Sequence, residues 1–89
     1  PFMMIFTSGT SGNPKAVRVA HLMPTFAGIS LAQRFALSER DTCYVSMPLF
    51  HSNAVVAGWA PAVVSGASIV PAKFSASNFL ADVRRYDVT

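Results

Sequence analysis

Acidic residues, histidine and cysteine are all scarce in this chain of 89 residues. It has four Asp and Glu against seven Lys and Arg, two His, and Cys43 as its single cysteine. One cysteine cannot form an internal disulfide, and no histidine or cysteine lies at the spacing of zinc ligands. We therefore predict a chain that holds no metal of its own and that works in a reducing compartment, the cytoplasm.

The basic residues are scattered along the chain. The formal net charge is +3, yet among the seven basic residues only Arg84 and Arg85 are adjacent. A protein that binds nucleic acid needs a basic patch or stripe, which this pattern does not supply. The sequence predicts no nucleic-acid partner, and four other cations are interpreted as solvated surface charges: Arg18, Arg34, Arg40 and Lys73.

Charged side chains are absent between Thr42 and Ala72. A membrane-spanning helix needs about 20 mostly apolar residues, so this run is long enough to raise the question. Pro48, Pro61 and Gly66 interrupt it, however, and the pattern divides into pieces of strand and helix length. We predict a buried strand–helix–strand unit instead of a membrane span, and leave open a peripheral membrane contact of a longer parent protein.

The chain is apolar for its size, with 52% hydrophobic and 12% charged residues. A domain this small buries only about 60% of the surface that its unfolded chain exposes, so its core is thin. An apolar composition of this kind suits the interior of a larger body. The chain also begins within an apolar run and ends without a polar tail. We therefore expect a fragment of a larger protein.

Two strands are predicted on either side of a polar loop. Residues 2–6 form an apolar run of strand length, and residues 16–21 partly alternate small or apolar with polar side chains. Asn13 and Pro14 between them are a turn signal, because proline fixes its own φ and disfavours helix at the residue before it. The pattern predicts a β-hairpin.

A helix is predicted between Pro24 and Phe35. Pro24 fits a first helical turn, and apolar side chains then recur at steps of three and four residues. This spacing places them on one face, which we expect to pack on a sheet: Phe26, Ile29, Ala32 and Phe35.

The remaining residues predict strand, helix, strand and helix. Strands are expected at 43–47 and 67–70, joined by a helix that Ser52 or Asn53 caps, that Pro61 kinks and that ends at Gly66. A last helix, capped by Ser75 or Ser77, would place four apolar side chains on one face: Phe79, Leu80, Val83 and Tyr86. The order of elements predicts an α/β fold, a layered sheet with flanking helices in which the later strands are mainly parallel.

Residues 7–15 have the composition of a loop that binds phosphate. Glycines let backbone N–H groups turn toward a polyanion, hydroxyls donate further hydrogen bonds, and a lysine adds a compact positive charge. The loop is not a Walker A motif, because Lys15 lies three residues after Gly12 and a strand follows it. An ordinary Ser/Thr/Gly hairpin turn remains an alternative. The candidate phosphate ligands are Thr7, Ser8, Gly9, Thr10, Ser11, Gly12 and Lys15.

Two motifs resemble those of the adenylate-forming enzymes, the superfamily of acyl-CoA synthetases, luciferases and peptide-synthetase adenylation domains. Residues 6–16 resemble the signature Tyr/Phe-Thr-Ser-Gly-Thr-Thr-Gly-x-Pro-Lys-Gly, with Ser11 where threonine is usual and Ala16 where glycine is usual. The serine keeps the hydroxyl, whereas the alanine adds a Cβ that bears on how the loop swings. Residues 47–54 resemble the Pro-Leu-Phe-His motif, with a continuation most similar to long-chain and very-long-chain fatty acyl-CoA synthetases.

The resemblance implies roles for individual residues. Lys15 and His51 would be catalytic: Lys15 would stabilise charge on the departing pyrophosphate, and His51 would position the acyl carboxylate. Ser52 and Asn53 would border the acid substrate, and Trp59 would line or gate an acyl tunnel. Without the resemblance, a histidine after a strand is more often packed than catalytic, and a single tryptophan on an apolar helix is more often core.

By resemblance, residues 1–89 are a partial AMP-binding (adenylation) domain from the large N-terminal domain of a fatty acid–CoA ligase. Such a parent joins a carboxylic acid to ATP, with Mg²⁺ accompanying the ATP, and then passes the acyl group to coenzyme A. The fragment lacks the adenine and ribose motifs and the lid with its catalytic lysine, so we expect it to be inactive alone. An amino-acid-activating or luciferase-like member of the superfamily remains an alternative, as does a non-enzymatic nucleotide-binding module.

Overall fold

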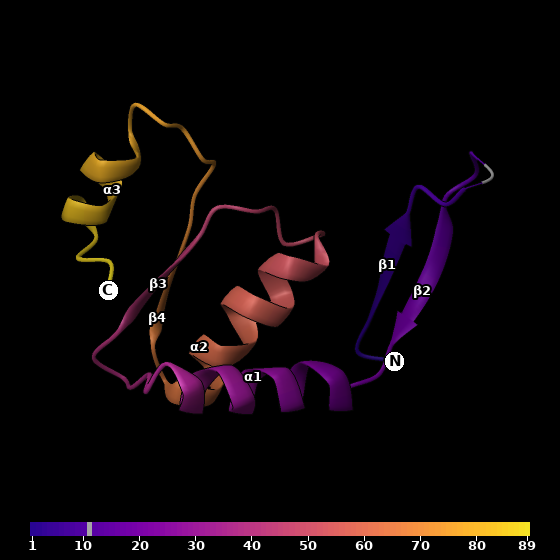
Figure 1. Cartoon of the computed structure of the whole chain (residues 1–89), viewed down its shortest axis with the longest axis horizontal. Helices are drawn as coiled ribbons and strands as arrows, with labels where there is room; N and C mark the ends of the chain where they lie inside the picture. The colour runs from indigo at the N-terminus through magenta and orange to yellow at the C-terminus, as the bar shows by residue number, and fades with distance from the viewer. Residues whose placement is uncertain (11) are drawn as a thin grey trace.

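The first two strands form the predicted hairpin. In the computed structural model, which describes residues 1–10 and 12–89, β1 (Met3–Thr7) pairs antiparallel with β2 (Lys15–Val19). The register places Thr7 opposite Lys15, so the polar loop begins where the pairing ends. Figure 1 shows the hairpin standing beside the helices, with its loop at the far tip.

The later strands form a second, parallel sheet. β3 (Thr42–Val45) pairs with β4 (Ser68–Pro71), and the chain crosses between them through the π-helix η1 (Ala54–Trp59) and the α-helix α2 (Ala60–Ser65). The α/β class and the parallel pairing of the later strands are confirmed. Within residues 1–10 and 12–89 the strands lie in two separate two-stranded sheets.

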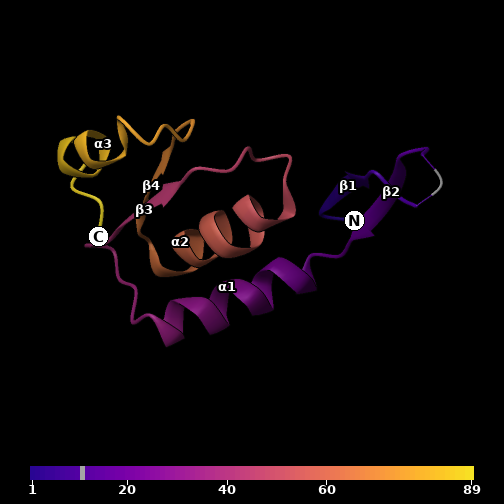
Figure 2. The same cartoon turned by 45° about the horizontal axis from the view of Figure 1, so that its top comes forward.

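Helix α1 (Leu22–Arg34) lies where the pattern predicted it, but its buried face is different. It packs against α2 and η1, not on a sheet (Figure 2). Pro24, Gly28 and Ala32 are its buried residues. Of the predicted face only Ala32 is buried, and the prediction is wrong for its large side chains, since Phe26 and Phe35 are 61% and 65% exposed.

Close approach of the two helices explains this difference. A Cβ on Gly28 would lie 2.8 Å from the carbonyl oxygen of Ala60, closer than real Cβ contacts come. Helices that pack this tightly need small residues at the crossing point, whereas large side chains hold helix axes further apart. The sequence period of large apolar residues therefore marked the wrong side of α1.

The crossover helix ends as predicted and begins differently. Gly66 adopts a left-handed conformation (φ 75°) at the C-cap, as the sequence suggested. The chain changes from π-helix to α-helix one residue before Pro61, which has no N–H to donate. The predicted cap at Ser52 or Asn53 is wrong: the N-cap makes no side-chain hydrogen bond, and the Asn53 N–H instead donates to Nδ1 of His51 at 3.3 Å.

Helix α3 (Phe79–Arg85) contacts β3 through an aromatic pair and a hydrogen bond. The rings of Tyr44 and Phe79 meet edge to face at 5.5 Å, and the Tyr44 hydroxyl donates to Oδ2 of Asp82 at 3.2 Å. The predicted caps are wrong, because the helix start has no side-chain cap, and the hydroxyls of Ser75 and Ser77 bond each other. Leu80, expected on the packed face, is 64% exposed.

The core consists of small side chains, and large ones lie at the surface. The buried hydrophobic residues are Val19, Ala32, Val45, Ala54, Val55, Ala60 and Ala62. Phe6 and Phe50 are 69% and 80% exposed. In residues 1–10 and 12–89, no helix has the length and apolar character needed to cross a membrane.

Candidate phosphate loop and carboxylate site

The tip of the hairpin contains two glycines with positive φ. Gly9 (φ 58°) and Gly12 (φ 80°) both lie in the left-handed region, which glycine enters without steric cost. Anion-binding nests use residues that alternate between right- and left-handed conformations, so glycines with positive φ are compatible with such a site. The sequence reading of these two glycines as turn-forming residues agrees with the structure. Ser11, between them, lies outside the described residues.

The side chains around the loop are open to an incoming ligand. Thr7, Ser8 and Thr10 are exposed, and Lys15 stands exposed at the base, paired across the hairpin with Thr7. Gly9 is also confined by space, since a Cβ there would lie 3.2 Å from the carbonyl oxygen of Asn13. The described loop thus offers hydroxyls, backbone N–H groups and one cation, with no acidic side chain to repel a phosphate.

The second motif is a connecting segment, residues 46–53, between β3 and η1. His51 is held by its backbone: its N–H donates to the carbonyl oxygen of Pro48 at 2.8 Å, and its own carbonyl accepts from Ala54 at 3.1 Å. The imidazole is exposed and uses Nδ1 as the acceptor for Asn53. If Nδ1 accepts a hydrogen bond, Nε2 of the neutral ring carries the proton and is free to donate.

Ser52 and Asn53 lie beside His51 at the start of the helix. Together with Met23 they line a hollow of about 300 Å³ between α1 and η1. Ser52 is half-buried and Asn53 is exposed. Trp59 lies further along the helix, where its ring stacks at a tilt on Phe2 with centroids 5.5 Å apart.

Trp59 also borders a cavity of about 240 Å³ that it shares with Leu49 of the connecting segment and with Val55. Its half-buried ring is both packed and next to an open space. The tunnel role and the core role of Trp59 therefore both stay predictions. His21 packs its ring edge to face on Phe2 at 5.5 Å.

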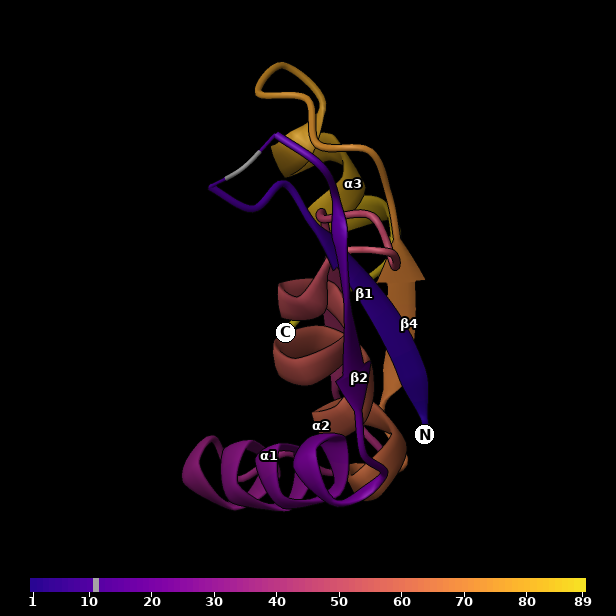
Figure 3. The same ribbon diagram turned by 90° about the vertical axis from the view of Figure 1, so that its right-hand side faces the viewer.

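The hairpin loop and the connecting segment both lie above α1 in the views of Figures 1 and 3. The hairpin loop follows β1, and the His51 segment follows β3, so both come after the carboxyl ends of strands. In open parallel sheets ligands bind at the carboxyl edge, a rule that applies here to the β3–β4 pair, whereas β1 and β2 form a separate antiparallel hairpin. Among the described residues no hydrogen bond joins the loop to His51.

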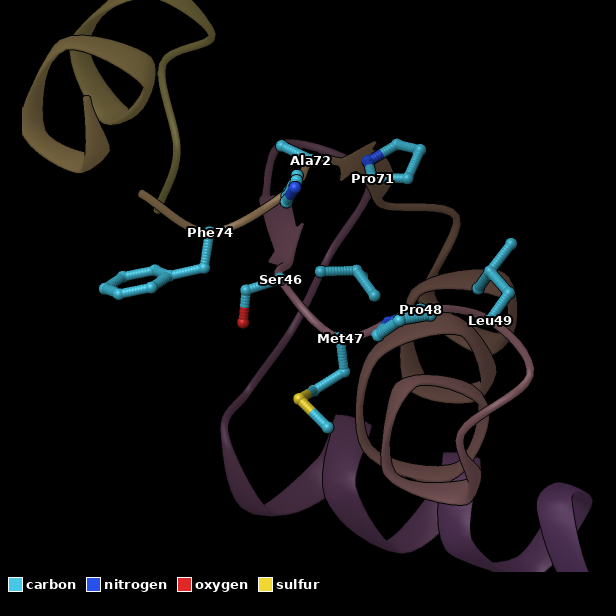
Figure 4. Close-up of a pocket in the computed structure, with 9 residues that line it drawn as sticks. Ser46, Met47, Pro48, Leu49, Pro71, Ala72 and Phe74 are labelled. Atoms are coloured by element: carbon cyan, nitrogen blue, oxygen red, sulfur yellow. The ribbon is translucent and has the colours of Figure 1, made fainter. Parts of the chain in front are cut away.

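A third feature, a cavity beside the His51 segment, was not predicted from the sequence. A cavity of about 570 Å³ lies after the ends of β3 and β4, between residues 46–49 and 71–74 (Figure 4). Ser46 and Lys73 are its polar lining, and Met47 and Phe74 are among its apolar lining. Lys73 is exposed, as predicted for a surface charge, and it also lines this cavity because it follows a strand that is parallel to β3.

The shifted pKa values belong to the β3 region away from the loop tip. Burial raises the pKa of the half-buried Cys43 thiol, and burial followed by the bond to Asp82 raises the pKa of the Tyr44 hydroxyl. The N–H of Ser38 and the hydroxyl of Thr89 lower the pKa of Asp41. These groups tie the strand to its neighbours and lie outside both motifs.

Residues 1–10 and 12–89 contain no group of three or more His, Cys, Asp or Glu that could hold a metal ion. Mg²⁺ prefers several oxygen ligands in octahedral geometry, usually including carboxylates and substrate phosphates.

Known proteins resemble this chain over nearly all of its length. The medium/long-chain-fatty-acid–CoA ligase FadD17 of Mycobacterium tuberculosis is 61% identical over 89 residues, which cover 99% of this chain and 18% of that protein. The steroid-22-oyl-CoA synthetase of Rhodococcus jostii is 44% identical and is matched over 16% of its length. The chain thus spans less than a fifth of the length of either relative.

A solved structure shares both fold and sequence. The o-succinylbenzoate coenzyme A synthetase MenE of Bacillus subtilis, solved in complex with ATP and magnesium ion, matches 97% of this chain and 23% of its own chain with a TM-score of 0.79 and 30% identity. The AMP-binding enzyme family matches residues 1–89, the whole chain. Because this family matches the whole chain, the chain belongs to the AMP-binding enzyme family.

Proposed function

We propose that this chain carries the phosphate loop of an ATP-dependent, AMP-forming fatty acid–CoA ligase. Residues 1–89 would be a partial AMP-binding domain of that larger polypeptide, here called the parent enzyme. One observation carries the proposal: in a chain of this family, Gly9 and Gly12 of the loop between β1 and β2 both have the positive φ that an anion-binding turn can use. The fatty-acid class follows from the likeness to FadD17.

The loop's share of the reaction is electrostatic. A carboxylate oxygen of the acid attacks the α-phosphorus of ATP, the bond from that phosphorus to the pyrophosphate oxygen breaks, and negative charge grows on the leaving pyrophosphate. Lys15, the loop hydroxyls and the loop N–H groups are open to solvent at the hairpin tip and can donate to that charge. A pre-placed donor of this kind contributes roughly 3 kcal/mol to the transition state.

The acid would lie at the other motif. His51 is exposed and its free Nε2–H can donate to a carboxylate oxygen, which would orient the acid for attack. Ser52, Asn53 and Trp59 border the adjacent hollows and would contact the rest of the acid. Transfer of the acyl group from the adenylate to the thiol of coenzyme A, with release of AMP, would complete the reaction.

Mg²⁺ would enter bound to the ATP phosphates, where it neutralises part of their charge. Because the described residues supply no carboxylate cluster, we derive no step through a metal held by this chain. Peripheral membrane contact of the parent enzyme stays a prediction.

Exchange of labelled pyrophosphate into ATP by the parent enzyme tests the proposal. Fatty acids are expected to stimulate the exchange, and added coenzyme A should then give an acyl-CoA product. Stimulation by amino acids instead would indicate an amino-acid-activating domain, and light emission with oxygen would indicate a luciferase-like member. No exchange with any carboxylic acid would indicate a nucleotide-binding module and would overturn the proposal.

A further inference from the structure

The two ends of the segment that carries His51 approach each other closely where η1 packs against β3. Residues 46–53 leave the sheet at Val45, the last residue of β3, and enter the helix at Ala54. Gly58, one turn further along η1, returns to Val45: a Cβ on Gly58 would lie 2.8 Å from Cγ2 and 3.4 Å from Cγ1 of that valine. The contact closes the base of the segment.

Both sides of this contact are fixed. Val45 is 4% exposed, and its carbonyl oxygen accepts a hydrogen bond from Ala72 at 3.1 Å, which ties the end of β3 to the end of β4. On the helix side, Ala54 and Val55 are 2% and 6% exposed. Since neither β3 nor η1 is free to move alone, the space at Gly58 determines how far apart the two ends of the segment stand.

The position of His51 depends on those ends. Its backbone bonds to Pro48 on one side and to Ala54 on the other, and its ring bonds to the N–H of Asn53. A shift of η1 away from β3 would therefore move Ala54, and with it the imidazole. Within residues 1–10 and 12–89 no other hydrogen bond reaches the ring.

We propose that Gly58 is a positioning residue: the absence of a Cβ there lets η1 lie against Val45 and so holds His51 where the acid substrate binds. The inference rests on the proposed function, because it assigns His51 to the acid. A methyl group at Gly58 would push the helix outward, and displacements of about 1 Å in reacting groups cost up to roughly a hundredfold in rate.

The contact predicts a specific rescue. Without its two γ-methyl groups, residue 45 would present its Cβ, which lies 3.6 Å from the Cβ built on Gly58, an ordinary van der Waals distance. Gly58→Ala should therefore be harmful alone and tolerated together with Val45→Ala. A residue needed only for backbone freedom would not be rescued in this way.

Gly28 supplies the matched control. A Cβ there also meets a neighbour at 2.8 Å, but that neighbour is the backbone of Ala60 at the α1–α2 crossing, away from His51. Gly28→Ala and Gly58→Ala thus create similar crowding in different places. Only the second is expected to disturb the acid site.

The experiment measures fatty-acid-dependent pyrophosphate exchange by four variants of the parent enzyme: Gly58→Ala, Val45→Ala, the double variant and Gly28→Ala. All rates are measured below the temperature at which any variant unfolds. Gly58→Ala should lower kcat by roughly ten- to a hundredfold, with the KM for ATP unchanged. The double variant should recover to within about threefold of Val45→Ala alone, and Gly28→Ala should keep the kcat of the unmodified enzyme. An unchanged kcat in Gly58→Ala, or equal losses with Gly28→Ala, would overturn the inference.

A second readout does not depend on activity. The imidazole NMR signals of His51, assigned by their loss in His51→Asn, should shift in Gly58→Ala, return in the double variant and stay in place in Gly28→Ala. If the unmodified parent shows no exchange, the proposed function fails. The NMR signals would still test whether Gly58 sets the position of His51. If Gly58→Ala does not fold, the double variant must show the unmodified His51 signals, and shifted signals there would contradict the inference.

Discussion

The hairpin loop and the helix crossing both depend on glycine, but for different physical reasons. Gly9 and Gly12 in the loop have φ of 58° and 80°, which side chains rarely adopt. Gly28 at the crossing has an ordinary helical backbone and is needed because Ala60 lies too close for a Cβ. The first requirement is local and, under the proposed function, serves binding. The second is tertiary and belongs to stability, so substitutions in the two regions should separate activity from folding.

The largest expected effect is on catalysis by the loop. Lys15→Ala in the parent enzyme should lower fatty-acid-dependent pyrophosphate exchange by roughly a hundred- to a thousandfold, as removal of one pre-placed donor does. The midpoint of thermal unfolding should stay unchanged, because Lys15 is exposed. Arg18→Ala on the same strand is the control and should leave exchange unaltered.

Gly9→Val extends this prediction to the backbone. The substitution forces a β-branched residue into a left-handed conformation and directs its Cβ at Asn13. MgATP affinity, measured by calorimetry, should fall with both Gly9→Val and Lys15→Ala. Unchanged MgATP affinity in both variants would show that the loop is an ordinary hairpin turn that does not bind phosphate.

The crossing should respond in the opposite way. Gly28→Ala places a methyl group against the backbone of α2, and overpacking of this kind costs about 1–3 kcal/mol of unfolding free energy. A urea titration of the parent enzyme measures the loss, while kcat of the folded fraction should not change. Ser30→Ala, exposed on the same helix, is the control and should alter stability by less than about 0.5 kcal/mol. Equal stabilities for both variants would contradict the tight crossing.

A smaller effect is expected where α1 ends. Ala36 has φ 51° at the position after the C-cap, where glycine is usual, and its neighbour Leu37 bonds back to Ala32 at 2.9 Å. Ala36→Gly should relieve a left-handed strain of about 1–2 kcal/mol, offset by the extra unfolded-state entropy of glycine, about 0.5–1 kcal/mol. The same change within the helix, Ala27→Gly, should destabilise. Urea midpoints that move the same way in both would contradict this account.

The smallest effect concerns pH. Asp41 accepts the Ser38 N–H at 2.7 Å and the Thr89 hydroxyl at 2.9 Å, which lowers the pKa of its carboxyl. A lowered folded-state pKa gives stability that is present above the unfolded value of about 3.9 and is lost as pH falls through the folded value. Unfolding midpoints between pH 5 and pH 3 should therefore fall more steeply for the unmodified protein than for Asp41→Asn. Glu39→Gln is the control and should retain the steep fall.

The outcome of the sequence predictions follows the range of the forces involved. The hairpin, the parallel β3–β4 pair and the stop at Gly66 were predicted correctly, because strand patterns and turn residues act over a few neighbouring residues. The buried face of α1 was predicted wrongly, since Phe26 and Phe35 dominate the apolar period but small residues make the contact. The helix caps were also wrong: the His51 imidazole accepts the Asn53 N–H before η1, and Ser75 and Ser77 bond each other before α3.

The site shows the same division. The loop glycines and the Pro-Leu-Phe-His motif could be identified from the sequence. The position of Lys73 at the cavity and the close contact of Gly58 with Val45 could not. Both depend on which segments lie side by side after folding. The residues that line the large cavity come from two strand ends more than 20 residues apart in the chain.

The sequence by itself determined the order of elements, the anion-binding chemistry of the loop and its family resemblance, because propensity, turn geometry and side-chain chemistry are properties of short stretches. Only the tertiary structure decided that α1 packs on helices through Gly28, that the strands form two separate sheets, and that Gly58 lies against Val45. Those facts depend on close packing between distant residues, where a single Cβ changes what fits.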